Sequence, residues 1–140
     1  MFKRALLLGI VSGILAGVAA LIYDKVYFST TRVDFSKVTS TVSILAATLI
    51  GGLLAGIGYW LLYKIMKGKG EVIFNFVFVI LSFASILTPL AAKLPLDIEF
   101  PELFPGLAVP MHFFPALAWF TLKPLFIQQT VKDYDKPAGV

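Results

Sequence analysis

The chain has 140 residues, of which 59% are hydrophobic and 14% are charged, and its formal net charge is +4. Soluble domains usually carry about 45–50% apolar and about 25% charged residues, so this composition excludes an ordinary soluble domain and favours lipid as the solvent. The sequence contains no cysteine, which excludes disulfides, thiolate metal sites and thiol nucleophiles.

The first apolar run covers residues 5–23 and follows Lys3 and Arg4. A basic start, an apolar stretch and small residues at 18–20 are also typical of a signal peptide. The run is long enough to cross a bilayer, which takes about 20 residues in a helix. We therefore expect a retained transmembrane helix.

Three further apolar runs follow at about residues 42–63, 72–92 and 110–127. Thr39, Ser40 and Thr41 precede the second run and are residue types that cap helix N-termini. Pro110 opens the fourth run, where a first helical turn tolerates proline. The sequence predicts an all-α fold, a polytopic four-helix transmembrane bundle in a single domain of residues 1–140. An acidic, proline-rich loop would join the third and fourth helices.

Lysine and arginine are distributed unevenly among the loops. The amino end, the second loop and the carboxyl tail hold two, three and two, whereas the first and third loops hold three and one. Positive residues accumulate in cytoplasmic loops. We therefore expect a multi-pass protein of the bacterial inner (cytoplasmic) membrane with both termini in the cytoplasm. The same rule explains the net positive charge, so we expect no nucleic-acid partner.

The third loop, residues 93–109, alternates apolar residues with prolines and acids between positions 94 and 101. Period two predicts an extended amphipathic segment, and the prolines exclude a central strand. We expect this segment to lie on the membrane surface or to cap the bundle, with Phe100, Leu103 and Phe104 facing inward. Its acids together with His112 have no diagnostic ligand spacing, so the sequence predicts no metal site.

Small residues recur at a spacing of four in the first two spans. The glycines that we expect at helix-packing faces are Gly9, Gly13, Gly17, Gly51, Gly52 and Gly56. Residues four apart share a helix face, and glycine lets two backbones approach closely. One interpretation is a tight internal hairpin of the first two helices. The other is packing against another subunit, because the second span has small residues on two adjacent faces.

Five polar or aromatic residues of the last two spans are candidates for ligand binding: Asn75, Ser82, His112, Trp119 and Lys123. The first two share one face of the third helix, and the other three share one face of the fourth. Hydrogen bonding between helices and anchoring at the interface would explain them. The alternative is a lined cavity or a proton-responsive site, because an ionisable side chain inside a membrane is costly.

The Met111-His112 pair at the start of the fourth span, with Thr88-Pro89 at the end of the third, resembles a family of small bacterial membrane proteins. That family has four predicted spans and a Met-His near the start of the last one. The resemblance covers nearly the whole chain and implies the four-span topology, but no activity. The chain does not resemble small multidrug exporters, which place an essential glutamate in the first span.

No acid–base pair, cofactor motif or metal spacing stands out, so we expect no cofactor and rank an enzyme last. The leading hypothesis is a non-enzymatic integral membrane protein, an accessory or structural subunit of a membrane complex or a homo-oligomer packed through glycine-rich faces. Its partners would be the lipid bilayer and other membrane subunits or itself. The alternative is a component of a small-solute or ion transporter or channel that uses the polar face of the third and fourth helices.

Overall fold

The computed structural model describes residues 1–127, and within this range the chain forms helices and no strand. The elements in chain order are α1 (Phe2–Thr31), α2 (Thr41–Met66), α3 (Gly68–Ser85), α4 (Leu87–Ala91), the 3₁₀ helix η1 (Pro101–Leu103) and α5 (Phe104–Phe126). Residues 128–140, which include the carboxyl tail with its two lysines, lie outside the described part.

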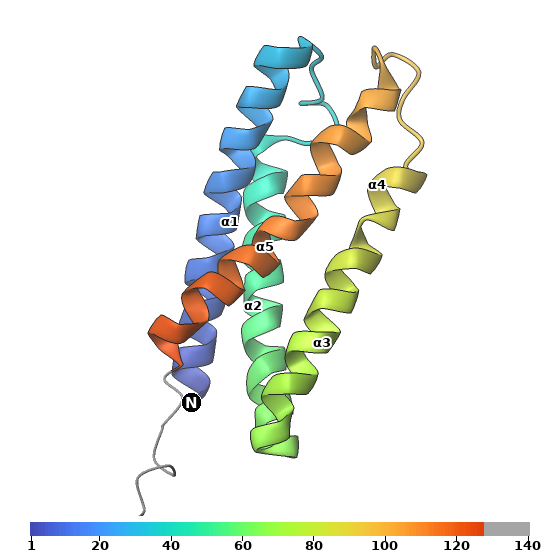
Figure 1. The fold of residues 1–140 in the computed structure, drawn as a ribbon. Coiled ribbons are helices and arrows are strands. Elements are labelled where there is room, and N and C mark those ends of the chain that lie inside the picture. Colours follow the sequence, from blue (N-terminus) through green and yellow to red (C-terminus); the bar gives the residue numbers. More distant parts are fainter. Residues whose placement is uncertain (128–140) are drawn as a thin grey trace, which may run out of the picture.

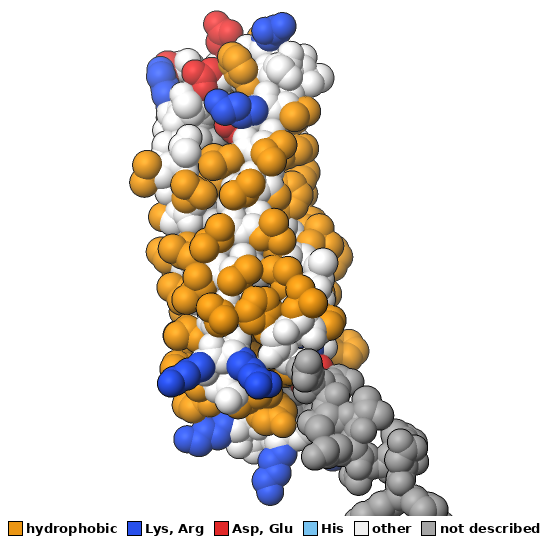
Figure 2. Space-filling view, turned by 90° about the vertical axis from the view of Figure 1, so that its left-hand side faces the viewer, with side chains coloured by type: hydrophobic (Ala, Val, Ile, Leu, Met, Phe, Trp, Pro, Cys, Tyr) orange, Lys and Arg blue, Asp and Glu red, His pale blue; other side chains and the backbone are white. Residues whose placement is uncertain are grey.

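Four helical segments of the described chain are long and apolar enough to cross a membrane. They are Phe2–Thr31, Thr41–Met66, Gly68–Ala91 and Pro101–Phe126. Figure 2 shows apolar side chains in a broad band around the middle of the molecule, with charged side chains gathered at both ends. The predictions of an all-α fold and of four such helices are therefore confirmed.

The molecule is elongated and has two distinct ends. The hairpin end holds the start of α1, the turn between α2 and α3 and the end of α5, and the loop end holds residues 32–40 and 92–103 (Figure 1). α1 and α2 pack against each other along their length, and α5 crosses them (Figure 1). α2 and α3 lie together at the hairpin end and diverge toward the loop end (Figure 1).

α1 and α2 meet with their backbones nearly in contact. A Cβ atom on Gly9 would overlap the carbonyl oxygen of Gly52, and a Cβ on Gly52 would overlap the carbonyl oxygen of Gly9. A Cβ on Gly13 would lie 2.8 Å from the Thr48 carbonyl oxygen. Only glycine fits at such approaches, because any side chain would push the two helices apart.

The last helix begins earlier than expected, at Phe104 rather than near Pro110. Proline inside a helix leaves the carbonyl four residues earlier without its N–H partner, and for Pro110 this is the carbonyl of Gly106. The Tyr23 hydroxyl of α1 donates to that oxygen at 2.8 Å. A residue far away in the sequence therefore stabilises the turn of α5 that the local pattern disfavours.

α3 ends at Ser85, and after a turn at Ile86 the short helix α4 continues in nearly the same direction (Figure 1). Pro89 lacks the N–H that would bond the carbonyl of Ser85, so the break has a local cause. The third apolar segment is therefore interrupted near the loop end.

The loop between α4 and η1 differs from the expected extended segment. Ile98 N–H donates to the Pro95 carbonyl at 3.2 Å, so this part turns. Phe104 is buried and Leu103 is partly buried, as expected, but Phe100 is 58% exposed and the prediction that it faces inward is wrong. The turn breaks the period-two alternation, and Ile98 enters the core cluster of the loop end instead of Phe100.

The two loops of this end are tied together by an exposed ion pair. The Lys37 ammonium of the first loop donates to the Asp97 carboxylate of the third loop at 2.5 Å. The pair lowers the pKa of the Asp97 carboxyl and raises that of Lys37, because each charge is favoured by its hydrogen-bonded partner.

Candidate functional site

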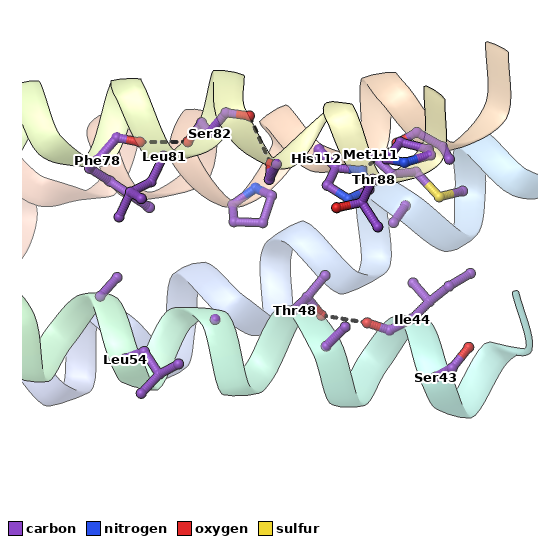
Figure 3. A pocket seen from close by; sticks show the side chains of 18 of the residues that line it. Ser43, Ile44, Thr48, Leu54, Phe78, Leu81, Ser82, Thr88, Met111 and His112 are labelled. Carbon is purple, nitrogen blue, oxygen red and sulfur yellow. Dashed lines mark hydrogen bonds between the residues drawn. The ribbon is translucent and has the colours of Figure 1, made fainter. Parts of the chain in front are cut away.

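A groove with a volume of about 950 Å³ runs between α2 on one side and α3 and α4 on the other. Residues of α5 form its back wall, as the close view in Figure 3 shows. The groove exists because α3 is held against α2 only near their turn. There a Cβ on Gly70 would overlap the Leu62 carbonyl, and Phe74 packs edge-on to Tyr59 with ring centroids 5.3 Å apart.

Small residues contribute four positions to the α2 wall of the groove, which also includes Ile44, Leu54 and Leu62. Ala47, Gly51, Ala55 and Gly58 all line it. A Cβ on Gly51 would meet no atom within 4 Å, whereas one on the adjacent Gly52 would overlap α1. The two small-residue faces of α2 therefore have different surroundings, since one packs on α1 and the other faces the groove.

This difference divides the six glycines expected at packing faces. Five of them lie between α1 and α2: Gly9, Gly13, Gly17, Gly52 and Gly56. Gly51 does not lie there, although a row through Gly51 and a row through Gly52 are equally visible in the sequence. An internal hairpin therefore accounts for five glycines and leaves the face of Gly51 to another role.

Polar side chains enter the groove mainly toward the loop end. Two of the five candidate ligand-binding residues, Ser82 and His112, line it. The other polar lining residues are Thr39, Ser43, Thr48, Ser85 and Thr88. In Figure 3, Ser43, Thr88 and His112 lie at one end of the groove, and Leu54, Phe78 and Leu81 lie toward the other.

Most of these polar groups bond to the backbone of their own helix. Ser82 Oγ donates to the Phe78 carbonyl at 2.8 Å, and Ser85 Oγ donates to the Ser82 carbonyl at 2.7 Å. His112 Nδ1 lies 2.7 Å from the Ala108 carbonyl oxygen. A carbonyl can only accept, so Nδ1 is the donor of this hydrogen bond.

The remaining candidates lie outside the groove. Lys123 Nζ lies 2.7 Å from Glu71 Oε1, donates to Asn75 Oδ1 at 3.2 Å, and sits 5.4 Å from the centroid of the Tyr59 ring. The Lys123 and Glu71 side chains are only 12% and 19% exposed. This cluster joins α3 to α5 near the hairpin end, and it satisfies a lysine that apolar surroundings would otherwise disfavour.

Trp119 stands between the groove and this ion pair in the core. It is fully buried, with its ring centroid 5.3 Å from that of Phe74 and 5.8 Å from that of Tyr59. Within residues 1–127, the indole Nε1 has no hydrogen-bond partner. Trp119 is therefore a packing residue that contributes no polar atom to the groove.

Glu71 is the residue of this region that sequence reasoning missed. It sits just before the third apolar run, where it reads as part of a basic turn. The available signal was Lys123, because a lysine inside an apolar helix needs a partner and Glu71 is an acid that the α2–α3 turn brings to the same end of the bundle. The structure thus separates the five candidates into Asn75 with Lys123, Ser82 with His112, and Trp119 in the core.

Among the described residues, no group of three His, Asp or Glu side chains could hold a metal ion. His112 bonds to its own backbone, and no aspartate, glutamate, lysine or arginine is among the residues that line the groove. Comparison with protein-family models, curated proteins and solved structures gives no match. The resemblance to a family of small four-span membrane proteins stays a prediction.

Proposed function

We propose that this chain is a non-enzymatic, multi-pass protein of the bacterial cytoplasmic membrane, and that it acts by binding another apolar component of the bilayer in the groove between α2 and α3. Four helices of sufficient length and hydropathy support the membrane setting. The hairpin end would face the cytoplasm, because its amino-terminal segment and the turn between α2 and α3 are basic. The cations there are Lys3, Arg4, Lys64, Lys67 and Lys69.

The observation that carries the binding function is the contrast between Gly51 and Gly52. Both are small residues in the middle of one helix, but a side chain on Gly52 would strike α1 whereas one on Gly51 would meet nothing within 4 Å. In lipid, small residues on a helix face allow another group to approach closely and gain dispersion energy. The accessory-subunit or homo-oligomer hypothesis is one form of this function, in which a helix supplies the bound component.

Conduction of a polar solute fits the groove less well. No charged side chain is among its lining residues, and its serines direct their protons to their own backbones. The partly buried Lys123 is engaged with Glu71 and Asn75 away from the groove. The transporter alternative predicts pH-dependent solute flux in liposomes that His112→Ala abolishes.

A matched set of variants tests the binding function. Gly51→Leu fills the groove, and Gly68→Leu makes the same change at another position where a Cβ would meet nothing within 4 Å, outside the groove. Wild type and both variants would be extracted from native membranes in polymer-bounded discs and analysed by native mass spectrometry. We expect wild type and Gly68→Leu to retain a component in fixed stoichiometry that Gly51→Leu loses. Retention by all three proteins with equal stoichiometry would refute the proposal.

The absence of cysteine from the sequence allows a direct test of orientation. A membrane-impermeant thiol reagent applied to intact spheroplasts should label Glu99→Cys at the loop end and spare Lys67→Cys at the hairpin end. Lysed cells, in which both variants should react, provide the control. The reverse pattern would overturn the proposed orientation.

A further inference from the structure

Lysine and arginine side chains gather at the hairpin end of the molecule, where Figure 2 shows them below the apolar band. Lys3 and Arg4 come from the start of α1, Lys64 from the last turn of α2, and Lys67 and Lys69 from the junction of α2 and α3. All five residues are exposed, and within residues 1–127 none of them forms an ion pair. They form a basic surface at this end of the protein.

The acids of the described chain do not neutralise this surface. Glu71 is paired with Lys123, whose Nζ lies 2.7 Å from Glu71 Oε1. The other acids of residues 1–127 lie toward the loop end, at positions 24, 34, 97, 99 and 102. A countercharge for the basic surface therefore comes from outside the described chain.

The ends of α1 and α2 are joined at this surface through Trp60. The Phe2 ring packs edge-on against Trp60 with ring centroids 5.0 Å apart, and Lys64 Nζ lies 5.2 Å from the centroid of the Trp60 ring. Because Lys3 directly follows Phe2, this contact brings lysines of two helices to the same rim. Tryptophan is enriched where membrane hydrocarbon meets water, so Trp60 also marks the level of the lipid headgroups.

The basic surface continues directly into the apolar band. Lys3 shares a face of α1 with Leu7, four residues on, and Lys64 shares a face of α2 with Leu61, three residues before it. Leu7 is 49% exposed and Leu61 is 46% exposed. A ligand with an anionic head and apolar chains can contact both the lysines and the leucines, whereas a soluble anion can contact only the lysines. This continuity favours a lipid over a soluble partner.

We propose that the hairpin end binds an anionic phospholipid. Its phosphate lies at Lys3 and Lys64, beside Trp60, and its acyl chains lie along Leu7 and Leu61. A cation next to a membrane span strengthens the binding of anionic lipid roughly fivefold. This inference goes beyond the proposed function, because it uses the membrane setting but not the groove.

Trp60 is a reporter within the site. Of the two tryptophans in the sequence, Trp119 is fully buried, so bromine atoms on lipid chains should quench mainly the partly exposed Trp60. The wild-type protein would be reconstituted in bilayers of phosphatidylcholine and phosphatidylglycerol, with bromine on the chains of one lipid or the other. We expect stronger quenching by brominated phosphatidylglycerol than by the same fraction of brominated phosphatidylcholine. Equal quenching by the two lipids would overturn the inference.

Charge variants test which cations are responsible. In Lys3→Gln/Lys64→Gln, the preference for phosphatidylglycerol should fall roughly fivefold for each lysine replaced. Lys3→Arg/Lys64→Arg retains both charges and should keep the preference. Lys25→Gln/Lys93→Gln makes the same change at exposed lysines toward the loop end and should also keep it. A preference that survives Lys3→Gln/Lys64→Gln, or that Lys25→Gln/Lys93→Gln lowers as much, would overturn the inference.

Two further measurements separate a lipid from a soluble anion and this surface from the groove. Soluble glycerol phosphate should leave the quenching unchanged, because it has no chains. Relief of quenching by glycerol phosphate would show that the surface binds phosphate alone, which would overturn the assignment to lipid. Gly51→Leu, which fills the groove, should keep the preference for phosphatidylglycerol. Loss of the preference in Gly51→Leu would place the lipid in the groove, which would overturn this inference and leave the proposed function standing.

Discussion

Replacing Gly52 by alanine adds one methyl group where α1 and α2 are closest. The new Cβ would overlap the carbonyl oxygen of Gly9 and would lie 3.0 Å from the Cα of Gly13 and 3.1 Å from its nitrogen. All three atoms belong to the backbone, so no side-chain rotation can relieve the contact. α1 must move away from α2, which loosens the contacts on both sides of Gly52.

The magnitude follows from comparison with Gly51→Ala. Both variants make the same change at neighbouring positions of one helix, so the intrinsic preference of the helix for alanine cancels between them. Gly51→Ala meets no atom within 4 Å and should be neutral or slightly stabilising. Overpacking typically costs about 1–3 kcal/mol. We expect the free energies of unfolding of the two variants to differ by about this amount.

Reversible unfolding in mixed micelles, titrated with sodium dodecyl sulfate, measures this difference. Trp119 is fully buried in wild type and provides a fluorescence signal of the folded state. Equal slopes for the two variants would show that the same transition is compared. Equal unfolding free energies, or a loss in Gly51→Ala as large as that in Gly52→Ala, would refute the assignment of the two faces.

Three further predictions concern polar contacts. Lys123→Met leaves Glu71 without its ammonium partner 2.7 Å away and should lower the free energy of unfolding in the same titration by about 2 kcal/mol, less than for a fully buried pair. Adding Glu71→Gln should recover much of the loss. No recovery would argue against coupling between Lys123 and Glu71. Tyr27→Phe removes a 2.6 Å hydrogen bond to a backbone carbonyl of η1 and should lower the free energy of unfolding by about 1 kcal/mol. Unchanged stability would contradict a role for this hydrogen bond. The lowered pKa of Asp97 means that its tether to Lys37 operates above the ordinary carboxyl value and is lost as the pH falls through the lowered one. Proteolytic protection of the loop between α4 and α5 should therefore drop at acidic pH in wild type, and Asp97→Asn should show weak protection at every pH.

Most of the helical framework could be predicted from the sequence, because hydropathy and length are local properties. A run of about 20 apolar residues needs a helix in lipid whatever its neighbours are. The start of α5 could not be predicted this way, because Pro110 marks a boundary by every local rule. The Tyr23 hydroxyl, which comes from another helix, removes the cost of the free Gly106 carbonyl.

The candidate site was only partly visible in the sequence. Helical periodicity placed His112, Trp119 and Lys123 on one face of α5, but a face is wide enough to meet several environments. The tertiary structure places His112 in the groove, Trp119 in the core and Lys123 beside Glu71. The pairing with Glu71 depends on how α3 leans against α5, which no pattern within either helix encodes.

The glycines show most clearly what the sequence could predict and what it could not. The sequence by itself determined that α2 has two small-residue faces, because spacing along a helix converts directly into direction around it. Only the tertiary structure decided that the face of Gly52 meets α1 and that the face of Gly51 lines the groove. The physical reason is that close packing depends on which backbone arrives opposite a glycine, and that depends on the positions of the other helices.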